Sequence, residues 1–205
     1  MIEAVLRATP LFWPGALLSA LTGLLCSRRL GRRLGTHPLA AFLLVLSLGG
    51  IATFTLLPDI NSHYLDGLRY AESGYASHWH APRLAELTSV NQDSLNVALF
   101  VPLGVAVAHI RPGKGAAWSA VAAAALPFGI EATQYAVPWL LRACDLQDIV
   151  DNLLGLALGL FAGHVLGLVA RAGASFRRAR SGPPRAPRAP RAPRGSLGAA
   201  AQPGP

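Results

Sequence analysis

The feature that most constrains this chain is an apolar run, residues 39–57, that contains no charged residue. The hydrocarbon core of a bilayer is about 30 Å thick, and roughly 20 apolar residues in a helix span it. Hydrophobic residues make up 52% of the chain and charged residues only 14%, whereas soluble domains carry about 25% charged residues. The sequence therefore predicts a membrane protein and excludes an ordinary soluble domain.

Four further apolar runs approach the length of a membrane helix, at residues 10–26, 95–110, 116–135 and 149–170. Together with the first run they predict an all-α fold, a polytopic helical membrane protein with about five transmembrane helices. We expect the run at 10–26 to be an uncleaved span, because basic residues follow it rather than precede it.

The basic residues between the apolar runs predict the orientation of the helices. Four arginines lie in residues 27–37, two basic residues in 111–115, and eight of the 18 in 171–194. Positively charged loops stay in the cytoplasm, so the N-terminus, residues 58–94 and residues 136–148 are expected outside and the C-terminus inside. The net charge of +8 then belongs to cytoplasmic loops and predicts no nucleic-acid partner.

The same pattern predicts three regions. Residues 1–38 hold the first transmembrane helix and a basic cytoplasmic loop, and residues 39–170 form a helical membrane domain with an outer loop at 58–94. Residues 171–205 form a basic tail rich in proline, arginine and alanine, with the triplet R-A-P repeated three times. Such a composition favours a disordered cytoplasmic segment. Cys26 and Cys144 are expected as free thiols at opposite faces of the membrane.

Several polar residues are predicted close to the outer ends of the helices, where burial of an ionisable group costs about 2.5–3.5 kcal/mol. Because of that cost, such residues are candidates for function. We expect them to line a pocket open to the cell surface, although the sequence does not say which helices touch. The candidates for substrate binding are Asn96, Glu131, Gln134, Arg142, Asp145, Asp148 and Asn152.

Helical periodicity gathers several of these residues on one face of the fifth helix. At about 100° per residue, five positions share an arc of about 80°. They are Asp145, Asp148, Asn152, Gly155 and Gly159. Gly163 continues the four-residue spacing of the glycines, which allows a neighbouring helix to approach closely. Asp151 falls off the centre of this stripe and is not included in the site.

Structural roles compete with this interpretation. Asp145 is equally suited to cap the fifth helix, with Asp148 favoured in its first turn by the helix dipole. Arg142 would then neutralise one of the two carboxylates, and Glu131 would form a single interhelical hydrogen bond. Capping does not explain Glu131, Gln134 and Asn152, which lie deeper along their helices, and we favour function for the set as a whole.

Three motifs resemble those of the VanZ-like membrane proteins: N-V-A-L-F-V-P-L-G (residues 96–104), E-A-T-Q (131–134) and R-A-C-D-L-Q-D-I-V-D-N-L-L-G (142–155). They match the family pattern N-x-x-x-F-x-P-x-G, E-x-x-Q and R-x-x-D-x-x-D-x-x-x-N-x-x-G over about residues 39–170. The resemblance implies a multi-span helical protein of the bacterial cytoplasmic membrane. The founding member of the family is associated with low-level resistance to teicoplanin.

Two classes of function fit these residues. In the first, a non-catalytic membrane protein in contact with membrane lipids binds a lipid-linked envelope precursor or a lipoglycopeptide. In the second, Glu131, Asp145 and Asp148 hold a divalent cation in an intramembrane enzyme, or Glu131 carries protons in a small ion-coupled transporter. The common nucleophile, P-loop and H-E-x-x-H motifs are missing, so we favour binding without a cofactor or metal. The ligand and the oligomeric state are not fixed by the sequence.

Overall fold

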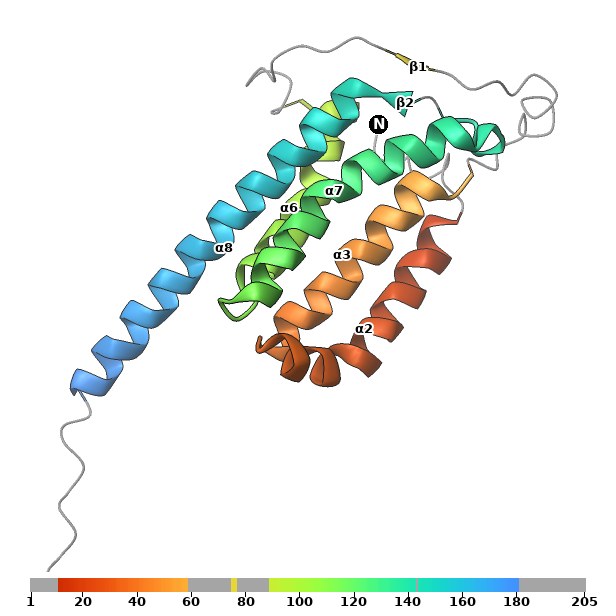
Figure 1. Cartoon of the computed structure of the whole chain (residues 1–205). Coiled ribbons are helices and arrows are strands. Elements are labelled where there is room, and N and C mark those ends of the chain that lie inside the picture. The colour runs from red at the N-terminus through yellow and green to blue at the C-terminus, as the bar shows by residue number, and fades with distance from the viewer. Residues whose placement is uncertain (1–10, 59–74, 77–88, 143, 181–205) are drawn as a thin grey trace, which may run out of the picture. The chain divides into compact units, whose positions relative to one another are not determined.

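The computed structural model describes residues 11–58, 75–76, 89–142 and 144–180. Five α-helices run through this part of the chain (Figure 1), so the all-α prediction is confirmed. The helices are α2 (Phe12–Leu34), α3 (Pro38–Leu56), α6 (Gln92–Ala108), α7 (Lys114–Ala136) and α8 (Leu146–Arg180). A 3₁₀ turn, η1 (Pro138–Leu140), and two short strands, β1 (Tyr75–Ala76) and β2 (Cys144–Asp145), complete the described elements.

Three of these helices, α3, α7 and α8, are long and apolar enough to cross a membrane. Helix α6 is a shorter apolar helix, and α2 carries four arginines in its second half. Rows of large apolar side chains are exposed on the helices, among them Leu17, Leu24, Phe161 and Leu168. Contiguous apolar surface of this kind is typical of a face that contacts lipid. Five spans remain a prediction, since two of the five helices fall short of these criteria.

Helix α2 is longer than the sequence predicted. The break expected at residues 27–37 is helical as far as Leu34, and the chain turns only at Gly35, which adopts a left-handed conformation with φ 63°. Arginine has a high helix propensity, so its charge ends the apolar run without ending the helix. Glycine adopts positive φ without a steric penalty, which explains why the turn occurs at this residue.

Local capping fixes where α3 and α6 begin. The Nδ1 atom of His37 accepts a hydrogen bond from the Leu39 N–H at 3.2 Å, and Pro38 occupies the first turn of α3. Asn91 and Ser94 form a reciprocal capping box, with the Ser94 N–H 2.8 Å from Asn91 Oδ1. This box starts α6 at Gln92, three residues before the apolar run that predicted it.

Small residues bring α2 and α3 together. A Cβ atom added to Gly49 of α3 would overlap Ser19 of α2, and one added to Gly15 of α2 would overlap Thr53 of α3.

A buried apolar cluster joins α3 to α6, α7 and α8. Its fully buried members are Ile51, Phe100, Leu103, Val107, Ala123, Ile130 and Leu156.

Helices α6 and α8 meet along a glycine seam, formed by Gly104 of α6 and Gly155, Gly159 and Gly163 of α8. A Cβ atom on Gly155 would overlap the carbonyl oxygen of Val97, and one on Gly163 would lie 2.6 Å from Ala108 Cβ. Glycine at these positions lets the two backbones touch. By contrast, a Cβ atom on Gly167, one turn further along α8, would meet nothing within 4 Å.

The helices alternate in direction, so their connections gather at two ends of the bundle (Figure 1). The arginine end holds the α2–α3 and α6–α7 connections with Arg28, Arg29, Arg32, Arg33 and Arg111. The carboxylate end holds the start of α6, the end of α7 and the start of α8, with Asp93, Glu131, Asp145, Asp148 and Asp151.

The predicted outer loop reaches the carboxylate end through its backbone. Strand β1 pairs in parallel with β2, so that Tyr75 lies opposite Cys144 and Ala76 opposite Asp145. The sequence did not predict this pairing, which adds a two-residue sheet to an otherwise helical fold. Most of the loop, at 59–74 and 77–88, lies outside the described residues.

Candidate functional site

Asp148 connects the first turn of α8 to the first two turns of α6. Its Oδ1 atom accepts a hydrogen bond from Asn96 Nδ2 at 2.7 Å. Gln92 Nε2 lies 3.2 Å from the same oxygen and 3.3 Å from Oδ2. The half-buried carboxylate is therefore held by two side-chain amides of α6. Of the residues predicted for the site, Asn96 and Asp148 are in direct contact.

Glu131 connects α7 to strand β2. Its side chain is 2% exposed, and Oε2 accepts a hydrogen bond from the Asp145 backbone N–H at 2.7 Å. The Cys144 thiol lies beside this carboxylate. The carboxylates of Asp145 and Asp148 are close enough to interact with it electrostatically. Glu131 thus binds the backbone of the strand before α8, instead of making the single helix-to-helix contact considered from the sequence.

Asp145 caps α8, which is the structural role that the sequence offered as an alternative to binding. Its Oδ1 atom accepts a hydrogen bond from the Gln147 N–H at 3.0 Å, which satisfies one of the free N–H groups of the first turn. Asp145 itself belongs to strand β2, and the helix begins at Leu146. Its place on the polar stripe of the fifth helix was therefore wrong, because the helical angle does not apply to a residue before the helix.

Two buried amides leave hydrogen-bond acceptors unused. Gln134 is 5% exposed and Asn152 is 2% exposed. Gln134 Nε2 donates to the carbonyl oxygen of Thr55 at 3.0 Å, which fixes the orientation of its amide and links α7 to the end of α3. Among the described residues, neither Gln134 Oε1 nor Asn152 Oδ1 has a hydrogen-bond partner. An unused buried acceptor costs about 1–3 kcal/mol, so each is suited to receive a donor from a ligand.

The sequence reasoning missed three residues of this region. Asp151 is fully buried, at 0% exposed, and its Oδ1 atom accepts a hydrogen bond from Gln147 Nε2 at 3.1 Å. The four-residue spacing of this pair was a signal that two side chains share one helix face. Gln92, the third, lies before the apolar run that defined the third span, and nothing in the pattern assigned it to a helix.

Arg142 lies on the connection into β2. It follows Leu141, whose φ of 55° turns the chain after η1, and its side chain is half-buried. Arg142 is thus at the same end of the bundle as the carboxylates, and its binding role stays a prediction.

The Cys144 thiol lies beside these carboxylates. Burial raises the pKa of Cys144 above its usual range, and the negative charge of Glu131 raises the pKa further. Both effects disfavour the thiolate. Cys144 and Cys26 are free cysteines, in agreement with the sequence.

The three motifs that first indicated a family now lie on helices that contact one another: α6, α7 and α8. A family model described as VanZ/LLP1 matches residues 44–167, which is more than half of the chain. The chain belongs to the VanZ/LLP1 family. No curated protein and no solved structure matches the chain. The VanZ/LLP1 match spans all seven residues predicted for the site and the glycine seam, whereas α2 precedes it.

Two further observations bear on the chemistry of this VanZ/LLP1 site. Within residues 11–58, 75–76, 89–142 and 144–180, no three His, Cys, Asp or Glu side chains are grouped to hold a metal ion. The grouping of Glu131, Asp145 and Asp148 around a cation therefore finds no support. A cavity of about 270 Å³ lies at the arginine end.

Proposed function

We propose that this VanZ/LLP1 protein is a multi-pass protein of the bacterial cytoplasmic membrane whose carboxylate end binds an envelope molecule at the outer face. The ligand is a lipid-linked envelope precursor or a lipoglycopeptide such as teicoplanin, and the protein binds it without catalysis. One observation carries the proposal: the unused buried acceptors Gln134 Oε1 and Asn152 Oδ1 lie at the carboxylate end, where Asp148 and Glu131 add further acceptors.

The distribution of charge supports the orientation. The arginine end holds five arginines in the described residues, and the segments that remain in the cytoplasm are enriched in Lys and Arg. The carboxylate end then faces outward, and the arginine-rich residues after α8 are cytoplasmic. The N-terminus is outside and the C-terminus inside, with α2 and α6 counted as spans.

The chemistry of the acceptors defines the ligand class. Carboxylates and amide oxygens accept hydrogen bonds, so the matching groups on a ligand are amines, hydroxyls and peptide N–H groups. Sugars and peptides of envelope precursors carry such donors, as do glycopeptides. The neighbouring surface is apolar, with Phe128, Tyr135 and Trp139 exposed, and is suited to an acyl chain. A ligand with a polar head and a lipid tail satisfies both.

The hydrogen bonds of the carboxylates hold them in place, as a binding surface requires. Glu131 Oε2 is occupied by the Asp145 N–H, and Asp148 is held by Asn96 and Gln92. These contacts fix the carboxylates as parts of a rigid polar surface.

The test is a measurement of inhibitory concentrations of teicoplanin and vancomycin in a susceptible bacterium that expresses the protein. Wild type is compared with Glu131→Gln and Asp148→Asn at matched membrane abundance. Asp93→Asn is the control, because Asp93 is an acidic residue of the same end outside the proposed site. We expect wild type and the control to raise the inhibitory concentration of teicoplanin several-fold. Both site variants are expected to lose this effect.

Either of two results would count against this proposal. If the site variants protect as well as wild type, the carboxylates serve only to pack the helices. If wild type has no effect on either glycopeptide, the ligand is not a lipoglycopeptide, and binding of a purified lipid-linked precursor to the same variants becomes the deciding measurement.

A further inference from the structure

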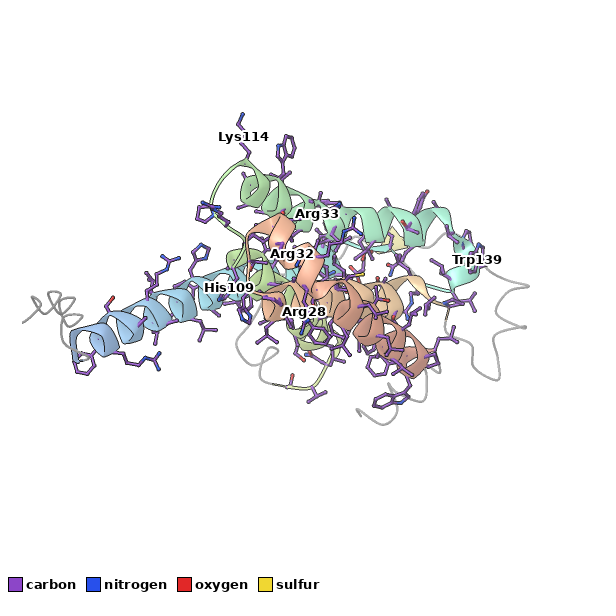
Figure 2. The ribbon with its side chains drawn as sticks, turned by 90° about the horizontal axis from the view of Figure 1, so that it is seen from below. Arg28, Arg32, Arg33, His109, Lys114 and Trp139 are labelled. Carbon is purple, nitrogen blue, oxygen red and sulfur yellow. The ribbon has the colours of Figure 1, made fainter. Side chains whose placement is uncertain are left out.

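The arginine end holds a cavity of about 270 Å³ between two chain connections. Arg32, Arg33 and Gly35 line it from the end of α2, and Arg111, Gly113 and Gly115 line it from the α6–α7 connection and the start of α7. Figure 2 shows Arg32 and Arg33 on the last turns of α2, away from Trp139 at the other end. Three arginines from two separate segments thus line one cavity.

The backbone ties these two segments together. The Arg111 N–H donates to the carbonyl oxygen of Leu34 at 3.2 Å, so the end of α2 is bonded directly to the connection between α6 and α7. Gly35 turns the chain at this point, and a Cβ atom there would lie 2.7 Å from Arg111 Cβ. The close contact holds the arginines of both segments at the same cavity.

The N-terminus of α7 also lines the cavity, through Gly113 and Gly115. Its cap residue is Gly113, which provides no side-chain hydrogen bond to the first turn. The N–H groups of a first turn have no partner within the helix, and together with the helix dipole they favour an anion. A Cβ atom at Gly113 or Gly115 would meet nothing within 4 Å, so there is space for a ligand beside these N–H groups.

The described residues provide no negative charge to balance the arginines. All five acidic residues of the described part lie at the carboxylate end. Across these described segments, no carboxylate is paired with Arg32, Arg33 or Arg111. Like charges gathered around one cavity repel one another unless an anion is present, and arginine binds phosphate oxygens through two parallel hydrogen bonds.

We propose that this cavity binds a phosphate group, carried by the headgroup of an anionic lipid or by a soluble phosphate. Arg32, Arg33 and Arg111 bind its oxygens, and the first N–H groups of α7 complete the site. The site is separate from the carboxylate end and does not depend on the ligand proposed there.

The full-length protein, purified in detergent, provides the test by native mass spectrometry with phosphatidylglycerol, and with phosphatidylcholine as the zwitterionic comparison. The double variant Arg32→Gln/Arg33→Gln removes two charges at the cavity. The matched control Arg28→Gln/Arg29→Gln removes two charges from the same helix one turn earlier, at residues that do not line the cavity. Arg111→Gln tests the second segment, and circular dichroism checks that each variant retains its helices.

A preference for phosphatidylglycerol that persists in the control but falls about tenfold in Arg32→Gln/Arg33→Gln, and also falls in Arg111→Gln, supports a lipid phosphate. If lipid retention shows no preference, the melting temperature with and without inorganic phosphate at constant ionic strength distinguishes the soluble source. A phosphate-dependent increase that only the cavity variants lose supports a free phosphate. Equal losses in the two double variants, or no response to either probe, would overturn the proposal.

Discussion

The two ends of the bundle are both charged, but they hold their charges differently. At the carboxylate end Glu131, Asp151 and Asn152 are buried, and Glu131 and Asp148 accept hydrogen bonds from residues of other elements. At the arginine end the arginines are exposed, and three of them line a cavity. Burial without a partner is costly for a polar group, so the carboxylates of the first end depend on the hydrogen bonds that hold them in the packed helices. The arginines of the second end are in contact with solvent and do not depend on packing.

The glycine seam supports the carboxylate end, and its disruption has the largest predicted effect. Gly155→Val places a side chain against the carbonyl oxygen of Val97, which is backbone and cannot move aside. We expect a loss of about 3 kcal/mol in the free energy of unfolding, because overpacking separates α6 from α8. Unfolding of the purified protein by detergent titration measures this loss.

Gly167→Val is the matched control for that substitution. It makes the same change on the same helix, at a residue whose added Cβ atom meets nothing within 4 Å. Its stability is expected to remain within about 0.5 kcal/mol of wild type. Equal stability of the two variants would contradict the close approach of α6 and α8.

The second prediction compares the two ends directly. Asp148→Ala leaves the amide donors of Asn96 and Gln92 without their acceptor, which costs about 2 kcal/mol in part-buried surroundings. Arg32→Gln changes an exposed side chain and is expected to cost no more than about 0.5 kcal/mol. The same detergent titration measures both. A larger loss for Arg32→Gln would reverse the distinction between the ends.

The third prediction concerns the reactivity of Cys144 and has the smallest effect. The thiolate is the reactive form, and the raised pKa of Cys144 keeps its fraction low at neutral pH. In a Cys26→Ser background, maleimide labelling should therefore be slow at pH 7 and increase as the pH rises. Glu131→Gln removes a negative charge beside the thiol, lowers its pKa and should increase the rate a few-fold. Burial is the larger cause of the raised pKa of Cys144 and remains in the Glu131→Gln variant. The labelling rate of this variant should therefore stay below that of an exposed thiol.

Helix positions were largely predictable from the sequence, because each apolar run corresponds to one helix. Their ends were not, because capping depends on individual hydrogen bonds. Helix α6 starts at the Asn91–Ser94 box and α2 continues through its arginines to Gly35. The pairing of β1 with β2 also escaped prediction, since two-residue strands leave no periodic pattern.

The sequence predicted that the site residues lie near helix ends, but it did not predict their partners. Glycine spacing indicated that a helix would approach α8, and only the structure identifies it as α6. Asn96 and Asp148 are 52 residues apart in the sequence. A local sequence pattern does not predict a contact between residues so far apart. Asp151 was set aside because its helical angle differed from that of the stripe, although the helix is buried on more than one side.

The most direct test of the account is the side of the membrane that each end faces. A single cysteine is placed at Trp139, which is 55% exposed at the carboxylate end, or at Pro112, which is exposed at the arginine end, in a Cys26→Ser/Cys144→Ser background. Intact cells are then treated with a membrane-impermeant maleimide. We predict that Trp139→Cys reacts in intact cells and that Pro112→Cys reacts only after the membrane is permeabilised. The reverse pattern would place the carboxylates in the cytoplasm and contradict a site for envelope molecules.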